Sequence, residues 1–405
     1  MKKIVVFGAG NIGRSLVGHL FARAGYEVVF VDAINEIVSL LNAEKRYRIE
    51  VKDVHPETIW VESVRAVNGN DIDAVTQEVA TADILATAVG VGNLQHIYRN
   101  IADGLTRRRR LKKGPIDVII CENVRNASNM LKEGLARLLP KDFPLDSSIG
   151  LVETSIGKMV PIVTEKQRRE DPLLIYAEAY NKIILDKKGF KNEVPKVEGL
   201  EPKDNMSAYV DCKLFVHNLG HAATAYLGYL TDPATVYIWE AIGYDHVGRA
   251  VRSAMWESGK ALILQYPDEF NHTNIKEQIE DLIRRFNNKA LGDTIYRVGR
   301  DLLRKLSRND RLVGALLLTH KHKILAPLTT LSTAAAMFFR AKDEKGKLYP
   351  TDRDFAEKIY RRGVDYVVRR VCGLDPVVDK AIVDNIKKAY VDISKAPSNW
   401  FSALG

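Results

Sequence analysis

The sequence predicts an α/β chain that begins with a doubly wound parallel sheet and ends in a mainly α-helical domain. In the first half, short β-rich runs alternate with segments of helical period, which is typical of a parallel sheet covered by helices. In the second half, apolar residues recur at helical spacing almost throughout. We place the domains at 1–193 and 194–405, with 189–203, rich in Lys, Pro, Gly and Glu, as a linker.

Length and composition indicate a soluble globular protein of two or three domains. Of 405 residues, 46% are hydrophobic and 27% are charged, as in ordinary globular chains. No run approaches the roughly 18 apolar residues of a membrane span, and the apolar start at 3–7 is too short for a signal peptide. Cys121, Cys212 and Cys372 are isolated, which argues against a disulfide framework or zinc cluster. We therefore expect a cytoplasmic protein without a membrane partner.

The net charge of +9 raises the question of an anionic partner. The densest basic run is 107–113, and no aromatic residues are interleaved with it to stack on bases. We interpret it as a solvated loop before a strand at 116–120 and expect no nucleic-acid partner.

A glycine-rich turn follows the first strand, Lys3–Phe7. Its glycines, Gly8, Gly10 and Gly13, are followed by a helix to about Ala24 and a second strand ending at Asp32. In this context the pattern is the dinucleotide fingerprint of a Rossmann-type domain, since glycines let the backbone approach a pyrophosphate at the helix N-terminus. No arginine follows Asp32 to hold a 2′-phosphate, so NAD is favoured over NADP. The alternative is a turn of the same shape that binds no phosphate. The predicted cofactor residues here are Gly8, Gly10, Asn11, Ile12, Gly13 and Asp32.

Further strands are predicted in the first half, and the carboxyl ends of two of them add cofactor contacts. The predicted strands are 58–61, 83–90, 116–120 and 148–152, with 173–178 and 182–185 extending or closing the sheet. The residues expected beside the cofactor at these ends are Ala88, Val89, Glu122 and Asn123.

The second half is predicted to be helical. Predicted helices cover 206–230, 235–264, 274–287, 311–320 and 328–339. The final helix is predicted to have Asp375 as cap and Pro376 in its first turn, with Val378, Ile382, Ile386 and Ala389 as its inner stripe.

The helix predicted at 206–230 carries an amine, a carboxamide and an imidazole. At roughly 100° per residue, Lys213, His217 and His221 share one stripe, with Asn218 beside it. A lysine of lowered pKa can act as a general base for an alcohol proton, and Asn218 with His221 can hold an alkoxide. The alternative is a solvated lysine and a satisfied core histidine. We interpret His217 as a packing or supporting residue.

Metal chemistry is not expected. His320 and His322 diverge on a helix, and no acidic cluster accompanies them.

Several segments together resemble a known family. They are 8–14, 87–90, 121–123, 213–228 and 297–312. In these segments the chain resembles the mannitol-1-phosphate 5-dehydrogenases of the polyol-specific long-chain dehydrogenase family. The resemblance implies metal-independent, NAD-linked interconversion of mannitol 1-phosphate and fructose 6-phosphate. It further implies Lys213 as general base and Asn218 with His221 as partners of the carbonyl oxygen.

Two departures from that family leave the substrate open. The chain has Gly157 and Lys158 where the family often has Asp and Arg, and Asn181 where it commonly has Trp. An unphosphorylated polyol or a hexuronate is therefore an alternative substrate, and a non-catalytic NAD-binding protein is the alternative from another class. We expect a monomer or small homo-oligomer.

A sugar phosphate requires basic side chains, and the candidates are Arg300, Arg304 and Lys305. Arg311 would join them if one helix ran straight through 307–310. The alternative is that these residues form ion pairs on a helical surface.

Overall fold

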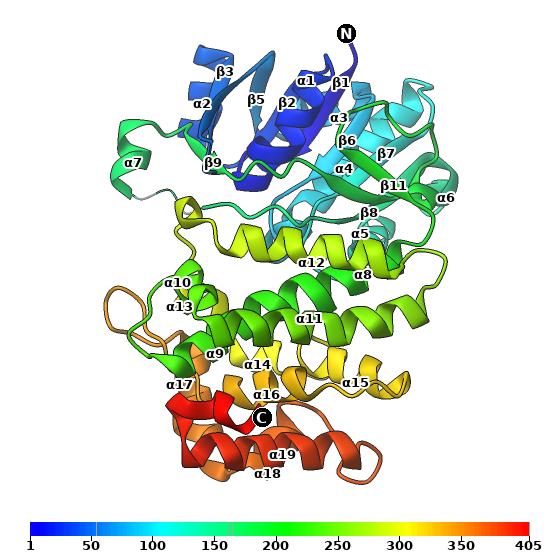
Figure 1. Ribbon diagram of the computed structural model, residues 1–405. Coiled ribbons are helices and arrows are strands. Elements are labelled where there is room, and N and C mark those ends of the chain that lie inside the picture. The colour runs from blue at the N-terminus through cyan, green and yellow to red at the C-terminus, as the bar shows by residue number, and fades with distance from the viewer. Residues whose placement is uncertain (54, 162, 164, 405) are drawn as a thin grey trace. The chain divides into compact units, whose positions relative to one another are not determined.

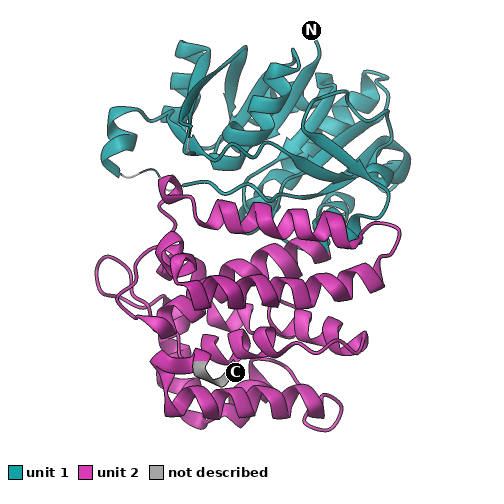
Figure 2. Ribbon diagram, viewed as in Figure 1, with its two compact units in different colours: residues 1–210 teal, residues 211–405 magenta. Residues whose placement is uncertain are grey.

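The computed structural model describes residues 1–53, 55–161, 163 and 165–404. Its contacts divide the chain into two compact units, unit 1 (1–210) and unit 2 (211–405), coloured separately in Figure 2. This division falls later than the predicted boundary at 193/194. Within the described part of the chain, no helix combines the length and apolarity that a membrane crossing requires.

Unit 1 is built on an eight-stranded sheet in the order β11-β10-β8-β7-β6-β1-β2-β5. All neighbouring strands run parallel except β8 and β10. From β5 to β8 the order is that of a dinucleotide-binding fold, so the predicted doubly wound architecture is confirmed. The strands are β1 (Lys3–Phe7), β2 (Glu27–Asp32), β5 (Val64–Asn68), β6 (Ile84–Thr87), β7 (Ile116–Ile120), β8 (Ile149–Ser155), β10 (Ile183–Asp186) and β11 (Leu200–Lys203).

Both faces of this sheet are buried, as expected for parallel strands covered by helices. Successive residues of β1 alternate between two cores: Ile4 and Val6 belong to one, Val5 and Phe7 to the other. The helical segments of unit 1 are η1 (Gly13–Gly18), α1 (His19–Arg23), α2 (Asn35–Glu44), α3 (Ile72–Thr81), η2 (Val91–Asn93), α4 (Leu94–Arg110), α5 (Ala127–Ala136), α6 (Leu145–Ser148), α7 (Glu165–Glu170) and η3 (Lys187–Gly189). Figure 1 shows them around the strands.

A separate three-stranded sheet corrects the placement of two predicted strands, 58–61 and 173–178. It consists of β3 (Arg46–Val51), β4 (Glu57–Glu62) and β9 (Ile175–Ala177). The prediction that 173–178 extends the main sheet is wrong, because β9 pairs in parallel with β3 instead. The predicted linker 189–203 also contains a strand, since β11 pairs with β10.

The basic run at 107–113 differs from the predicted loop. Its arginines form the last turn of α4, where positive charge faces the negative end of the helix dipole. Arg108 is buried, and its guanidinium donates to the carbonyl oxygens of Ala82 (2.7 Å) and Gly114 (2.7 Å). Part of this charge therefore serves the fold of unit 1.

Unit 2 is helical, as predicted (Figure 1). The chain enters it through α8 (Met206–Cys212), which crosses the division between the units. Its elements are η4 (Lys213–Asn218), α9 (Leu219–Thr231), α10 (Ile238–Gly243), α11 (Asp245–Gln265), α12 (His272–Phe286), η5 (Lys289–Leu291), α13 (Ile295–Gly299), α14 (Leu302–Lys305), α15 (Val313–Lys321), α16 (Pro327–Ala336), α17 (Pro350–Asp354), η6 (Phe355–Ile359), η7 (Tyr360–Arg362), α18 (Val364–Arg370), α19 (Lys380–Lys395) and η8 (Pro397–Leu404).

The helix predicted at 235–264 is two helices. Tyr244 has extended backbone angles, φ −67° and ψ 119°, and separates α10 from α11. The Glu240 carboxylate accepts the N–H groups of Val236 and Tyr237 and fixes the start of α10.

The last helix begins later than predicted. The Asp375 carboxylate accepts the N–H groups of Val377 and Val378 in a local turn, and α19 starts at Lys380. Val378 is 77% exposed, so its assignment to the inner stripe is wrong, whereas Ile382 and Ile386 are buried as predicted.

Candidate active site

The glycine turn of unit 1 is held by two close backbone approaches. Gly8 has φ +98°, and a Cβ there would lie 2.5 Å from the carbonyl oxygen of Ala88. A Cβ on Gly13 would lie 2.0 Å from the carbonyl oxygen of Gly8. A Cβ on Gly10 would meet nothing within 4 Å. The turn is therefore closed behind Gly8 and Gly13 and open at Gly10, which suits the approach of a pyrophosphate.

This turn lies where the strand order of the sheet reverses. β1 has β2 on one side and β6 on the other. The N–H of Gly8 donates to Val31 O (2.8 Å), and the N–H of Ala88 donates to Phe7 O (2.8 Å). Gly8 and Ala88 therefore lie side by side at the carboxyl ends of β1 and β6, the position at which open α/β sheets bind ligands.

The helix that follows begins with a π-helical turn, η1. All six of its residues are buried, whereas Asn11 is exposed and Ile12 half-buried just before it. Asn11 and Ile12 thus occupy the open entrance of the helix, and their contact with a cofactor stays a prediction.

Asp32 connects the end of β2 to the glycine turn. Its Oδ2 accepts the N–H of Ala9 (2.8 Å), and its Oδ1 accepts the N–H of Ile34 (3.0 Å). These bonds fix the orientation of the half-buried carboxylate. Each oxygen retains acceptor capacity for a ribose hydroxyl.

Glu122 joins the ends of β6 and β7. Its side chain is buried, and its Oε1 accepts the N–H of Val89 (3.0 Å). Burial raises the pKa of this carboxyl above its usual range. Glu122 therefore shapes the loop that carries Ala88 and Val89, and Asn123 beside it is exposed.

Arg14 is a supporting residue that the sequence analysis did not single out. Although only 6% exposed, its guanidinium donates to Ala9 O (2.6 Å) and Leu173 O (2.7 Å). Tyr47 Oη in turn donates to Arg14 O (2.7 Å). Burial lowers the pKa of Arg14 to about 10. The signal in the sequence was a charged residue directly after Gly13, on a helix that must pack on the sheet.

In unit 2, the predicted catalytic residues Lys213 and Asn218 lie on a π-helical turn, and His221 lies on the helix that follows. η4 spans Lys213 to Asn218, and α9 continues from Leu219. A π turn holds more residues than an α turn, so the rotation assumed in the sequence analysis does not apply here. The rings of His217 and His221 nevertheless lie near each other, with centroids 6.2 Å apart. Single π turns inside α-helices occur frequently at functional sites.

The surroundings of Lys213 disfavour its charged form. Burial of its amine, together with the positive charge of Arg311, lowers its pKa from 10.5 to about 8. A lysine in this range exchanges protons near neutral pH.

His221 is oriented by an aromatic ring and a carboxylate. Its ring stacks on Phe286 with centroids 4.9 Å apart and planes 6° apart. Its Nε2 lies 3.0 Å from Asp293 Oδ2, a short contact that departs from good hydrogen-bond alignment. Burial lowers the pKa of His221, against the opposing effect of Asp293.

Asp293 is the second supporting residue that sequence reasoning missed. It is buried, and its Oδ1 accepts a hydrogen bond from Arg297 Nε (2.6 Å). Burial favours the neutral acid, but His221 and Arg297 hold its pKa below the usual range. The spacing of Asp293 and Arg297 indicates a helical ion pair, but no local signal connects Asp293 with His221.

His217 and Asn218 have different environments. His217 is buried, and burial together with the charge of Arg285 places its pKa well below the usual value. It is a neutral packing residue beside Phe286, with ring centroids 6.0 Å apart. Asn218 is half-buried at the end of η4.

The three predicted phosphate residues have separate partners. Arg300 lies over the rings of Tyr296 (5.7 Å) and Tyr349 (5.1 Å). Arg304 is half-exposed and pairs with Asp301 (2.6 Å) and Asp310 (3.3 Å). Lys305 is buried, and its ammonium donates to Val298 O.

Arg311 lies close to the predicted catalytic group. The helix is interrupted before it, because α14 ends at Lys305 and α15 begins at Val313. Its Nε donates to Asp310 Oδ1 (2.7 Å), and its charge lowers the pKa values of Lys213 and Lys305. Sequence periodicity alone could not place it there, because a turn changes the direction of the chain.

Metal-binding groups are not clustered. Within the described ranges, no group of three or more His, Cys, Asp and Glu residues is arranged to hold a metal ion. His322 contacts Gln265 Oε1 through Nε2 at 2.9 Å.

Both halves of the chain match parts of one family. Residues 2–199 match the Mannitol dehydrogenase Rossmann domain, and residues 205–393 match the Mannitol dehydrogenase C-terminal domain. The chain is also similar to a mannitol-1-phosphate 5-dehydrogenase of Brevibacillus brevis. The two are 37% identical over 355 residues, which cover 87% of this chain and 88% of the relative.

Two solved structures share the fold over nearly the whole chain. One is a D-sorbitol dehydrogenase in substrate-free form, with a TM-score of 0.81, 16% identity, and coverage of 98% of this chain and 94% of that one. The other is the Pseudomonas fluorescens mannitol 2-dehydrogenase ternary complex with NAD and D-mannitol, with a TM-score of 0.75, 16% identity, and coverage of 100% and 94%. At this identity the likeness shows the fold alone.

Proposed function

The chain belongs to the mannitol dehydrogenase family, and we propose that it interconverts mannitol 1-phosphate and fructose 6-phosphate, with Lys213 as general acid and base. It is an NAD-dependent polyol oxidoreductase. The mannitol-1-phosphate 5-dehydrogenase relative supports the phosphorylated substrate.

The observation that carries the mechanism is the environment of Lys213. Its pKa of about 8 leaves a useful fraction of neutral amine at neutral pH, which can remove the hydroxyl proton of a polyol. In the reverse direction the protonated amine returns that proton to the oxygen of a ketose. No metal ion is required for this proton transfer.

Asn218 and His221 are the proposed partners of the reacting oxygen. A carboxamide N–H and a ring N–H can stabilise the charge that develops on this oxygen. For His221, stacking on Phe286 and the contact with Asp293 restrict the ring. A restricted donor requires less reorganisation during the reaction.

The glycine turn and Asp32 fit NAD. Gly10 leaves room for the pyrophosphate, and Asp32 presents acceptors at the end of β2. The residues after Asp32 are Ala33, Ile34 and Asn35, which provide no cation for a 2′-phosphate. NAD, when bound, supplies or accepts the hydride.

Arg300 is the foremost candidate for the substrate phosphate. In the part of the chain that the structure describes, no carboxylate pairs with it, and the two tyrosine rings hold its guanidinium. Arg304 and Lys305 complete the proposed basic group. Arg304 already pairs with Asp301 and Asp310, and Lys305 donates to Val298 O. Arg304 and Lys305 would therefore attract the phosphate mainly through their positive electrostatic potential.

The two departures from the family pattern compensate each other. Lys158 is buried, and its ammonium donates to Tyr180 O (2.9 Å) and to Asn181 Oδ1. The shorter cation and the amide thus satisfy each other inside unit 1. This contact gives Lys158 and Asn181 a shared structural role, while nothing in the structure explains the loss of the carboxylate at Gly157.

The substrate is tested with NADH and a panel of ketoses: fructose 6-phosphate, fructose, tagaturonate and fructuronate. We expect NADH absorbance to fall rapidly with fructose 6-phosphate alone. Turnover with another ketose would retain the mechanism and replace the substrate. No turnover on the panel, with NADH binding intact, would favour a substrate outside the panel or a non-catalytic protein.

Arg300→Ala tests the phosphate assignment within the same assay. We expect KM for fructose 6-phosphate to rise by about tenfold, the value of one charge-assisted contact. Arg249→Ala, an exposed arginine that pairs with Asp245, is the matched control. An unchanged KM in Arg300→Ala would remove Arg300 from the site.

A further inference from the structure

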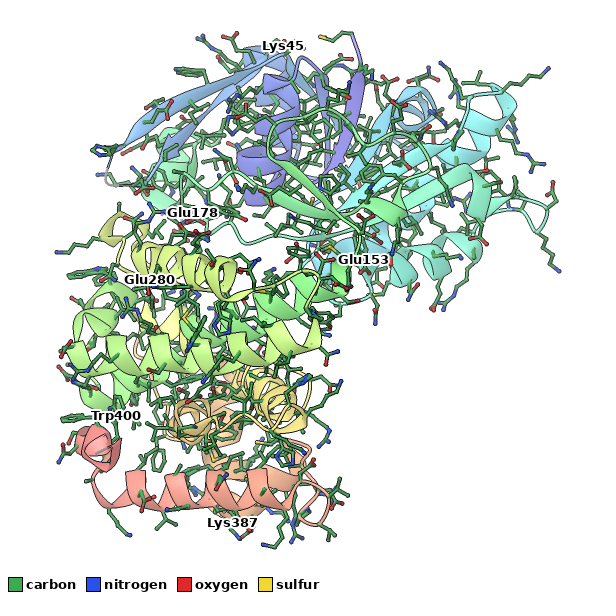
Figure 3. All side chains as sticks on the ribbon, turned by 45° about the vertical axis from the view of Figure 1, so that its right-hand side comes forward. Lys45, Glu153, Glu178, Glu280, Lys387 and Trp400 are labelled. Atoms are coloured by element: carbon green, nitrogen blue, oxygen red, sulfur yellow. The ribbon has the colours of Figure 1, made fainter. Side chains whose placement is uncertain are left out.

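A pocket lies in unit 2, between α11, α12 and the segment at the start of α16. Its volume is about 670 Å³, within the range of small-molecule sites. Its lining includes Arg252, Trp256, Lys260, Lys276, Ile279 and Leu325. None of the proposed catalytic or phosphate residues lines it. Figure 3 labels Glu280, which also borders it, on α12.

The carboxylates of this pocket already have partners. Glu257 is buried, and its oxygens accept the N–H groups of Leu328 (3.0 Å) and Thr329 (2.9 Å) at the start of α16. Glu280 accepts two hydrogen bonds from Arg252, at 2.8 and 3.0 Å. Three of the five charges are thus committed to the fold or to each other.

Two cations remain. Among the residues that the structure describes, no carboxylate forms an ion pair with Lys260 or Lys276, while many other lysines of the chain have one. They come from different helices, α11 and α12, and line the same cavity. The charge of Lys260 acts on Glu257 and that of Lys276 acts on Glu280, although neither contact is close enough for an ion pair. Since three cations face two carboxylates, the lining keeps an excess positive charge that favours an anionic ligand.

The remaining wall is apolar and partly aromatic. Trp256 is half-buried and meets the ring of His272 edge-on, at 5.4 Å and 63°. Leu325 is 86% exposed, and Ile279 and Pro327 complete this wall. An indole face next to exposed aliphatic groups suits a planar apolar body.

From this combination we propose that the pocket between α11 and α12 binds a small aromatic anion. Its phosphate or carboxylate contacts Lys260 and Lys276, and its ring lies against Trp256 and Leu325. This site is additional to the dinucleotide and substrate sites.

The test is calorimetric titration of the intact protein with 1-naphthyl phosphate, with saturating NADH present to occupy the dinucleotide site. We expect saturable binding that weakens about tenfold in the double variant Lys260→Gln, Lys276→Gln, because two charge contacts are lost that solvent screens, each worth less than a buried one. Trp256→Leu should weaken binding of both 1-naphthyl phosphate and neutral 1-naphthol. Glutamine retains the length of the side chain, and an unchanged Tm shows that each variant is folded.

Two controls separate this pocket from other sites. Lys388→Gln removes an exposed lysine on α19 and should leave the affinity unchanged. Arg300→Ala should also leave it unchanged. Absence of saturable binding at millimolar probe, equal affinity in the double lysine variant, or loss of binding in Arg300→Ala would each overturn the proposal.

Discussion

The two segments that we assign to cofactor binding and catalysis each contain a π turn, η1 and η4. They differ in what they require: η1 requires glycines, and η4 requires particular side chains. In unit 1, η1 follows a turn in which Gly8 and Gly13 leave no room for side chains. In unit 2, η4 carries Lys213 and His217 into a buried environment. The shape of the first, which we call the backbone segment, depends on the absence of side chains at its glycines. The chemistry of the second, the side-chain segment, depends on the residues that surround Lys213 and His217.

The comparison shows where local sequence is sufficient. The shape of the glycine turn follows from residues within one short stretch and the two strands that flank it. The chemistry of Lys213 depends on Arg311, and the orientation of His221 depends on Phe286 and Asp293. Phe286 is the last residue of α12, whereas Asp293 and Arg311 lie in segments that connect other helices of unit 2.

The largest expected effect comes from the side-chain segment. Lys213→Met should reduce turnover about 10²–10⁴-fold, the contribution of a positioned acid or base. NADH affinity, measured by fluorescence titration, should be retained, because the glycine turn is untouched. Lys388→Met is the control. Activity within a few-fold of wild type would show that Lys213 is not the base.

In the backbone segment, Gly13→Ala and Gly10→Ala form a matched pair. The new Cβ at Gly13 would lie 2.0 Å from Gly8 O, so the turn must shift, and we expect a loss of about 1–3 kcal/mol in unfolding free energy. At Gly10 the Cβ meets nothing within 4 Å, so Tm should stay unchanged while NADH affinity falls. Equal NADH affinity in Gly10→Ala and wild type would place the pyrophosphate elsewhere.

The fold was largely predictable because strand and helix periods are local. The doubly wound sheet, the helical second half and the glycine turn all followed from such patterns. The failures occurred where tertiary pairing decided the outcome: β9 joins β3, β11 forms in the predicted linker, and Val378 lies outside α19. Asp293 and Arg14 were missed for the same reason, since their roles lie in contacts with distant residues.

Asp293→Asn tests whether the surroundings of His221 matter. An amide keeps the size of the side chain but removes the charge next to the ring and to Arg297. We expect kcat to fall about tenfold, because the ring loses the adjacent carboxylate and the hydrogen bond from Arg297 then ends on a neutral amide. Asp245→Asn, on the exposed start of α11, is the control. If kcat is unchanged and only Tm falls, Asp293 serves the fold alone.

The smallest expected effect is a displacement of the pH profile by Arg311→Gln. Polyol oxidation requires neutral Lys213, so kcat/KM should rise with pH through the Lys213 pKa of about 8 and level off above it. Arg311 disfavours the ammonium form, so its removal raises that pKa and moves the rising limb toward higher pH, by about 1. Asp310 keeps Arg304 as a partner at 3.3 Å, which limits structural damage. Arg249→Gln should leave the limb in place, because this exposed arginine pairs with Asp245. If the rising limb does not move in Arg311→Gln, burial alone sets the pKa of Lys213. Ketose reduction provides a check: it requires protonated Lys213, so its kcat/KM falls as pH rises through the same pKa, and this falling limb must move in the same direction.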